Sequence, residues 1–299
     1  MSFSSETKAE LCDSRLDKRS LALAECYGVL LYCNTFRTSE IRIITASAPF
    51  AERLPRLFKK AFAFGFDQLP PEDALGKRSF CILDPEKITH ILESFGGDAG
   101  GPISHHINLG ILEDPGCSEA FVKGAFLAGG SVTDPEKRFH LELATSHHSV
   151  SRELRAMLLE MDLEPKEAER GAHSLLYFKK ADQISDFLAR IGAHVAAMNI
   201  LTAKVDKEMR NTVTRQINCD SANADKTVAA AQEQLDAIRR YVRAYGLDAM
   251  PEPLHDTALL RIANPAASLA DLALLSDPPV TKSCLSHRLK KIMEIAPKE

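Results

Sequence analysis

The stretch AFVKGAFLAGG, at residues 120–130, has a counterpart earlier in the chain, AECYGVLLYCN at residues 24–34. Gly124 falls on Gly28 at an offset of 96 residues. Both stretches are apolar and read as helices, and a glycine inside a helix costs about 1 kcal/mol relative to alanine. Close helix contact would offset that cost, because glycine lets two backbones approach each other. We therefore predict that the two helices pair, with Gly28 and Gly124 at the crossing.

The repetition continues beyond these two helices, in the same order in both halves. The paired blocks are EIRIITAS (40–47) with FHLELATS (139–146), SFCIL (79–83) with SLLYF (174–178), and DPEKITHILESFG (84–96) with KADQISDFLARIG (180–192). The first two pairs read as strands and the third as amphipathic helices. Each half has too few strands to stand alone as a sheet protein. The pattern predicts a duplicated, pseudo-symmetric α+β domain with halves at residues 1–100 and 101–200.

The two halves are joined by the glycine-rich segment ESFGGDAGGPISHH at residues 93–106. Its composition favours a flexible linker. A phosphate-binding loop is the alternative, but no G-K-[ST] sequence follows the glycines.

The composition of the chain becomes more polar after residue 200. Residues 201–223 are polar and are interpreted as a linker, and residues 224–299 as an all-α domain. A long helix is expected to begin at ANADKT, near residue 222, and to stop at Gly246. Shorter helices are expected in MPEPLHDTALLRIANP and after Ser268, which suits an N-cap. The last helix is expected from about Thr281 to Ala296.

The order of these helices indicates a helix-turn-helix, with the last helix as the recognition helix. Leu285, Leu289 and Ile292 recur at helical spacing and predict its buried stripe. Residues 281–299 hold five Lys or Arg against two Glu, so positive charge is concentrated there. A basic face at a helix C-terminus is the alternative explanation. The side chains predicted to contact DNA bases or phosphates are Lys282, Ser283, Ser286, His287, Arg288, Lys290 and Lys291.

Composition excludes several classes of protein. A chain of 299 residues that is 45% hydrophobic can bury two cores. Its 37 basic and 41 acidic residues give a net charge of −4, which excludes a histone-like binder. No apolar run reaches the roughly 18 residues of a membrane span, and the N-terminus lacks a secretory signal. Seven cysteines without a C-x-x-C indicate a reducing cytoplasm.

Other chemical signals are weaker. His105–His106 and His147–His148 are adjacent pairs, and neighbours on a strand point to opposite faces, so we expect no metal site from them. No G-x-S-x-G frames a nucleophile. The run of Arg53, Arg56, Lys59 and Lys60 on one helix is interpreted as a solvated face, or alternatively as a contact to DNA phosphates. Small core residues are the simplest interpretation of Cys12, Cys26, Cys33 and Cys81.

The two glycine-bearing helices resemble the signature helices of LAGLIDADG homing endonucleases. In that family the paired helices join two αββαββα halves, and each helix ends on an acidic residue that holds a divalent metal at the cleavage centre. The corresponding positions here are Cys33 and Gly129. Neither is a hard oxygen ligand for Mg²⁺. The resemblance therefore implies the nuclease scaffold without its catalytic pair.

A second resemblance covers essentially the whole chain. The blocks that carry it are SFSSETKAEL (2–11), KGAFLAGGSVTDPEKRFHLEL (123–143), INCDSANADKT (217–227) and PAASLADLALLSDPPVTKSCLSHRLKKI (265–292). Together they are similar to the WhiA family of bacterial sporulation and cell-division regulators. The resemblance implies a degenerate LAGLIDADG-type domain and a helix-turn-helix similar to the promoter-binding domain of sigma factors. The first signature helix is the loosest match.

The resulting prediction is a sequence-specific, DNA-binding transcription regulator of sporulation, cell-division and chromosome-segregation genes, without cofactor, metal or catalytic residue. Its expected partner is double-stranded promoter DNA, with RNA polymerase or another regulator on the N-terminal domain, and its expected place is the bacterial cytoplasm and nucleoid. Two alternatives stay open. One is a protein-interaction adaptor that binds DNA weakly. The other is a cryptic metal-dependent nuclease that uses Glu25 or Asp134.

Overall fold

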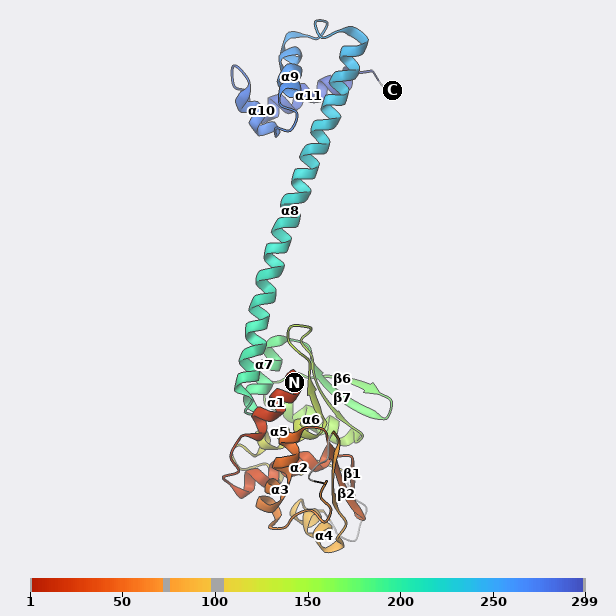
Figure 1. Cartoon of the computed structure of the whole chain (residues 1–299), viewed down its shortest axis with the longest axis vertical. Helices are drawn as coiled ribbons and strands as arrows, with labels where there is room; N and C mark the ends of the chain where they lie inside the picture. Colours follow the sequence, from red (N-terminus) through yellow and green to blue (C-terminus); the bar gives the residue numbers. More distant parts are fainter. Residues whose placement is uncertain (1, 72–75, 98–104, 298–299) are drawn as a thin grey trace. The chain divides into compact units, whose positions relative to one another are not determined.

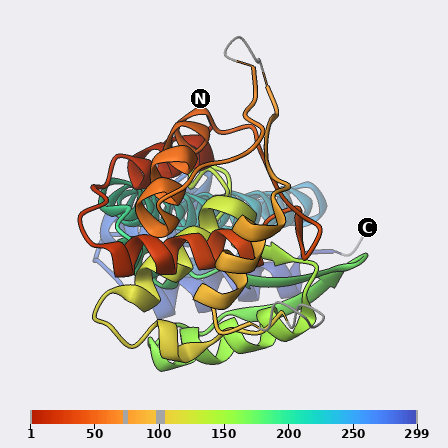
Figure 2. The same ribbon diagram turned by 90° about the horizontal axis from the view of Figure 1, so that it is seen from below.

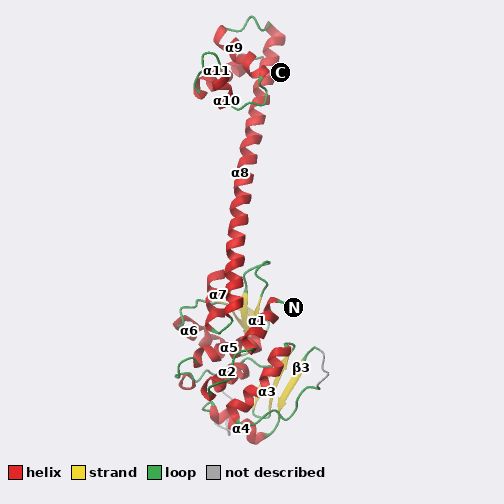
Figure 3. Ribbon diagram, turned by 60° about the vertical axis from the view of Figure 1, so that its left-hand side comes forward, coloured by secondary structure: helices red, strands yellow, loops and turns green. Residues whose placement is uncertain are grey.

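A computed structural model describes residues 2–71, 76–97 and 105–297. The chain divides into two compact units, residues 1–207 and 208–299. Figure 3 shows that all the strands belong to the first unit, whereas the second is helical. Half of the glycine-rich join, residues 98–104, lies outside the described residues. Within the described ranges, no helix is long and apolar enough to cross a membrane.

The first unit contains the predicted duplication. After helix α1 (Phe3–Cys12), the first half is built from α2 (Arg19–Leu31), β1 (Thr35–Arg37), β2 (Glu40–Thr45), α3 (Ala48–Phe62), β3 (Arg78–Ile82) and α4 (Pro85–Ser94). A 3₁₀ turn, η1 (Leu109–Ile111), precedes the second half. That half is built from α5 (Cys117–Gly129), β4 (Gly130–Val132), β5 (Leu141–Thr145), α6 (His148–Glu160), β6 (Lys166–Arg170), β7 (His173–Phe178) and α7 (Ala181–Arg190). The expected α+β class is confirmed.

Each half carries its own antiparallel sheet. The first sheet has the order β1-β2-β3 and the second β4-β5-β7-β6. Ile41 faces Ile82 across the β2–β3 pair, and Leu141 faces Phe178 across the β5–β7 pair. These four side chains are buried, so the register is set by the apolar face that each sheet turns to the core.

Helices α2 and α5 lie side by side and form the seam between the halves (Figures 1 and 2). A Cβ atom built on Gly28 would lie 2.0 Å from the carbonyl oxygen of Phe121, and one on Gly124 would lie 2.0 Å from that of Glu25. Phe121 follows Glu25 by the same 96 residues that separate the glycines. The contact is therefore symmetric, and the predicted glycine crossing is confirmed.

A single helix, α8 (His194–Tyr245), continues from the first unit into the second. The segment 201–223, expected as a linker, lies inside this helix, and the helix begins at His194 rather than near residue 222. Residues 208–230 are exposed throughout. The end is where the sequence indicated it, because Gly246 adopts a φ of +82° that favours glycine.

The second unit is completed by three short helices, α9 (Glu252–Ala263), α10 (Leu269–Leu275) and α11 (Lys282–Ile295). Ser268 caps α10 through a reciprocal capping box with Asp271. Thr281 caps α11, with its hydroxyl oxygen accepting from the backbone N–H of Cys284 at 3.2 Å. The helices enclose a small apolar core that α8 joins through Ile238. The three predicted helices are confirmed, with bounds within a few residues.

Candidate nucleic-acid interface

Helix α11 is anchored by the stripe that its sequence pattern predicted. Leu285, Leu289 and Ile292 are each no more than 1% exposed and belong to the core of the second unit. Residues 276–281 connect α10 to α11, which is longer than the three to four residues of a tight helix-turn-helix. Ser276 orders this connection, because its hydroxyl accepts from the N–H of Val280 at 3.0 Å and donates to the carbonyl of Ala273 at 2.9 Å.

The candidate DNA-contacting residues are distributed around the rest of α11. At 100° per residue, Ser283, His287 and Lys290 lie on the face opposite the buried stripe. Ser286 and Lys291 flank that face, and all five side chains are exposed. Hydroxyl, imidazole and ammonium groups on one exposed face can donate hydrogen bonds to base edges and phosphates.

The remaining two candidates are placed differently. Lys282 is exposed at the first turn of α11, on the side that faces α8 and α10. Arg288 is half-buried and lines a hollow together with the carboxylates of Glu252, Asp256 and Asp277. Because three acidic residues line the same hollow as Arg288, its surroundings favour a phosphate contact less than those of the exposed Lys291.

The positions that hold metal in homing endonucleases cannot do so in the same way here. A Cβ on Gly129 would lie 2.5 Å from the carbonyl oxygen of Ala144 and 2.8 Å from the ring of Tyr32, so no side chain fits there. The Cys33 thiol donates to the carbonyl of Thr35 at 3.2 Å, and burial raises its pKa to about 12. Within the described ranges, no group of three or more His, Cys, Asp or Glu side chains is placed to hold a metal ion.

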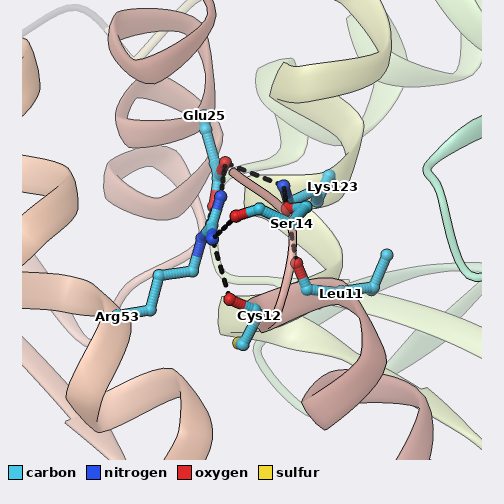
Figure 4. Close-up of polar contacts among 6 residues, drawn as sticks. All are labelled: Leu11, Cys12, Ser14, Glu25, Arg53 and Lys123. Atoms are coloured by element: carbon cyan, nitrogen blue, oxygen red, sulfur yellow. Dashed lines mark hydrogen bonds and ion pairs between the residues drawn. The ribbon is translucent and has the colours of Figure 1, made fainter. Parts of the chain in front are cut away.

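Glu25, proposed above as an alternative nuclease acid, belongs to a buried ionic cluster (Figure 4). Its carboxylate accepts from Arg53 Nε at 2.6 Å and from Arg53 Nη2 at 2.8 Å, and it lies 3.0 Å from the ammonium of Lys123. Glu25 is only 2% exposed and Arg53 only 1%. The expectation that Arg53 lies on a solvated face with Arg56 and Lys60 was therefore wrong, because α3 turns Arg53 inward.

Two cations and one carboxylate leave this cluster with an excess positive charge, which main-chain oxygens offset. Arg53 Nη1 donates to the carbonyls of Cys12 at 2.9 Å and Ser14 at 2.7 Å, where α1 ends. The C-terminus of a helix carries partial negative charge, so it stabilises a cation. Lys123 donates to the hydroxyl of Ser14 at 2.6 Å, and burial lowers the pKa of its ammonium. The cluster thus fastens α1, α2, α3 and α5 together.

The other alternative acid, Asp134, lies in a turn, where its carboxylate accepts from the N–H of Glu136 at 3.0 Å. The adjacent histidines, expected on strands, do not lie on strands. His105 precedes η1 in a loop and His147 precedes α6, and their rings stack with centroids 3.8 Å apart. Burial, together with His105, lowers the pKa of His147 to about 4. His148 instead bonds to the hydroxyl of Ser174 at 2.6 Å.

The fold and the geometry of the last three helices define a helix-turn-helix protein that also carries a duplicated LAGLIDADG-like domain. The family profiles that match the chain agree with this class: the WhiA LAGLIDADG-like domain over residues 118–210 and the WhiA C-terminal HTH domain over residues 213–296. The chain belongs to the WhiA family.

Similar proteins span nearly the full length of this chain. A probable cell division protein WhiA of Alkaliphilus metalliredigens is 33% identical over all of this chain and 98% of its own. The probable cell division protein WhiA of Desulfitobacterium hafniense is 36% identical over all of this chain and 96% of its own. The crystal structure of full-length DUF199/WhiA from Thermotoga maritima has 24% identity, full coverage of both chains and a TM-score of 0.61, which shows a shared fold.

Proposed function

We propose that this protein is a sequence-specific DNA-binding transcription regulator of genes for cell division, sporulation and chromosome segregation. The observation that carries the proposal is the exposed polar face of α11, held on a buried stripe in a helix-turn-helix of the WhiA family. The relatives are named probable cell division proteins, which supports cell division as the regulated process. Promoter DNA is the proposed partner, and the nucleoid the proposed place of action.

Within this proposal the two parts of the chain have different tasks. Residues 224–299 read promoter sequence through α11. Residues 1–200 form the duplicated domain, which offers a surface to DNA or to a protein such as RNA polymerase or a second regulator, and does not cleave DNA. The support for the last point is steric and electrostatic: Gly129 leaves no room for an acid, and Glu25 is committed to Arg53 and Lys123.

The α11 residues are expected to fall into two groups when they are changed. Lys291→Ala should weaken binding to every DNA sequence and reduce the slope of log affinity against log salt by about one unit, because one phosphate contact is lost. Ser283→Ala and His287→Ala should instead relax the preference for particular base pairs by about 1–3 kcal/mol. Fluorescence anisotropy against cognate and scrambled duplexes at several salt concentrations measures both effects.

Arg243→Ala is the matched control, because Arg243 is an exposed cation that belongs to α8 and not to α11. Binding and salt slope should match those of the unchanged protein. If Lys291→Ala, Ser283→Ala and His287→Ala all behave like this control while the full chain still binds DNA, then α11 is not the reader and the N-terminal domain is.

We expect no cleavage of DNA in Mg²⁺ or Mn²⁺. Metal-dependent hydrolysis needs carboxylates that fix the ions and align the attacking water, and positions 33 and 129 carry a thiol and no side chain. Supercoiled plasmid incubated with the full chain should stay uncut on an agarose gel. Nicking that EDTA abolishes and that Asp134→Asn removes would contradict the proposal and restore the nuclease alternative.

A further inference from the structure

A small hollow in the second unit lies between the last part of α8, the end of α9 and the first turns of α10 and α11. Its volume is about 230 Å³. The polar side chains that line it are Lys226, Thr227, Gln234, Arg261, Ser268 and Lys282. The rest of the wall is alanine and leucine. Of these residues only Lys282 was predicted from the sequence to bind a ligand, and Ser268 was predicted only to cap a helix, because α8, α9, α10 and α11 bring the lining residues together only in the folded chain.

Two of the lining side chains are buried and incompletely bonded. Arg261 is 1% exposed, and its Nε has no hydrogen-bond partner, although Nη1 donates to the carbonyl of Ala267 at 2.7 Å. Gln234 is 8% exposed, and its Oε1 has no partner. A buried polar atom without a partner costs about 1–3 kcal/mol, so this pair is unusual in a small core. Both residues line the hollow, so a ligand there would supply partners to these side chains once they turn toward it.

The charge of the hollow indicates what kind of ligand it takes. Lys226, Arg261 and Lys282 are three cations, and no carboxylate is among the residues that line it. Within the described part of the chain, none of the three forms an ion pair with an acid. Burial lowers the pKa of Arg261, and no neighbouring acid raises it. The carboxylate of Asp271 bonds to Ser268 in the capping box and is not among the lining residues. The residues that line the hollow thus form a concave cationic site without a carboxylate of their own.

We propose that this hollow binds a phosphate group. Guanidinium and ammonium groups form charge-assisted hydrogen bonds with phosphate oxygens. Rotation of the Gln234 amide by half a turn places its NH₂ donor where Oε1 lies, since oxygen and nitrogen ends of an amide are interchangeable in position. Pockets that enclose drug-sized ligands hold about 300–1,000 Å³, so 230 Å³ suits one or two phosphate groups rather than a whole cofactor.

The phosphate has two possible sources with the same chemistry. One is the DNA backbone next to the bases that α11 reads, and this source rests on the proposed function. The other is a small phosphorylated molecule that binds independently of DNA. Titration calorimetry of the full chain with inorganic pyrophosphate, in a phosphate-free buffer of low ionic strength, tests the shared chemistry directly.

We expect pyrophosphate to bind with measurable heat. Lys226→Gln, which removes a rim cation, and Gln234→Leu, which removes a buried donor, should each weaken binding about tenfold, the effect of one lost charge-assisted hydrogen bond. Arg243→Gln is the matched control: it removes an exposed cation from the same helix outside the hollow and should change nothing. Circular dichroism melts of each variant separate lost binding from lost folding.

A second titration, with the protein saturated by promoter duplex, distinguishes the sources. If the DNA backbone occupies the hollow, pyrophosphate will compete with DNA, and Lys226→Gln will weaken DNA binding while Arg243→Gln will not. If a small molecule occupies it, pyrophosphate will bind equally well with DNA present. The proposal is overturned if pyrophosphate gives no heat and Lys226→Gln binds DNA like the control. DNA binding by the unchanged chain reports separately on the proposed function.

Discussion

Gly28→Leu and Gly124→Leu are each expected to destabilise the first unit by at least about 3 kcal/mol, beyond the 1–3 kcal/mol that is typical of overpacked cores. The reason is the nature of the obstacle. A Cβ at either position would lie 2.0 Å from a main-chain carbonyl oxygen of the partner helix, so a side-chain rotation cannot relieve the overlap. The two helices would have to separate, which uncovers the buried residues of the seam.

Thermal unfolding followed by circular dichroism measures this effect. For a unit of about 200 residues, each kcal/mol corresponds to roughly 2–4 °C, so the melting temperature should fall by about 6–12 °C or more. Gly65→Leu is the matched control, because Gly65 is exposed and a Cβ built on it meets nothing within 4 Å. If both seam variants had the same melting temperature as the unchanged protein, α2 and α5 would not cross as described.

Glu25→Gln is expected to destabilise the first unit by about 3–5 kcal/mol, the usual effect of removing one partner from a buried ion pair. The glutamine keeps the size of the side chain but leaves the Arg53 guanidinium buried, and Lys123 beside it, without a carboxylate. The C-terminal carbonyls of α1 remain as partners, but they carry only partial charge. Because glutamine has nearly the same size as glutamate, the loss of unfolding free energy measures the effect of the missing negative charge.

Chemical denaturation with urea gives the free energy directly. Glu167→Gln is the control, since it breaks an exposed ion pair with Arg155 in the same unit and should leave the denaturation midpoint nearly unchanged. A double variant with Arg53→Met should be less destabilised than the sum of the single changes, because it removes the stranded cation. Equal stability of Glu25→Gln and the unchanged protein would mean that the cluster does not fasten α1 to the seam.

Local patterns in the sequence were enough to predict the features that depend on residues close to one another in the chain. The matched glycines predicted the helix crossing, Ser268 and Thr281 predicted helix starts, and the leucine spacing of α11 predicted its buried stripe. Each of these three features depends on the residue spacing within one helix or on the residue that caps it. The candidate DNA contacts on α11 follow from the same stripe, and their roles stay predictions.

Features that depend on distant residues were not predictable in this way. Arg53 is one cation in a basic run, and only the folded chain brings it to Glu25, 28 residues earlier. The continuity of α8 was missed for a different reason. Residues 211–223 contain Asn, Thr, Val and Asp, which are poor helix formers, so local propensity indicated a linker, whereas the structure continues the helix.

The crowding around Gly129 limits which substitutions this position can accept. A single mutation to an acidic residue cannot be accommodated, since the carbonyl oxygen of Ala144 and the ring of Tyr32 occupy the space that its Cβ would need. Ala144 belongs to strand β5 and Tyr32 caps helix α2. An acid at position 129 would therefore need a compensating shift in β5 and in the end of α2, so changes at these three places depend on one another and are expected to arise together rather than singly.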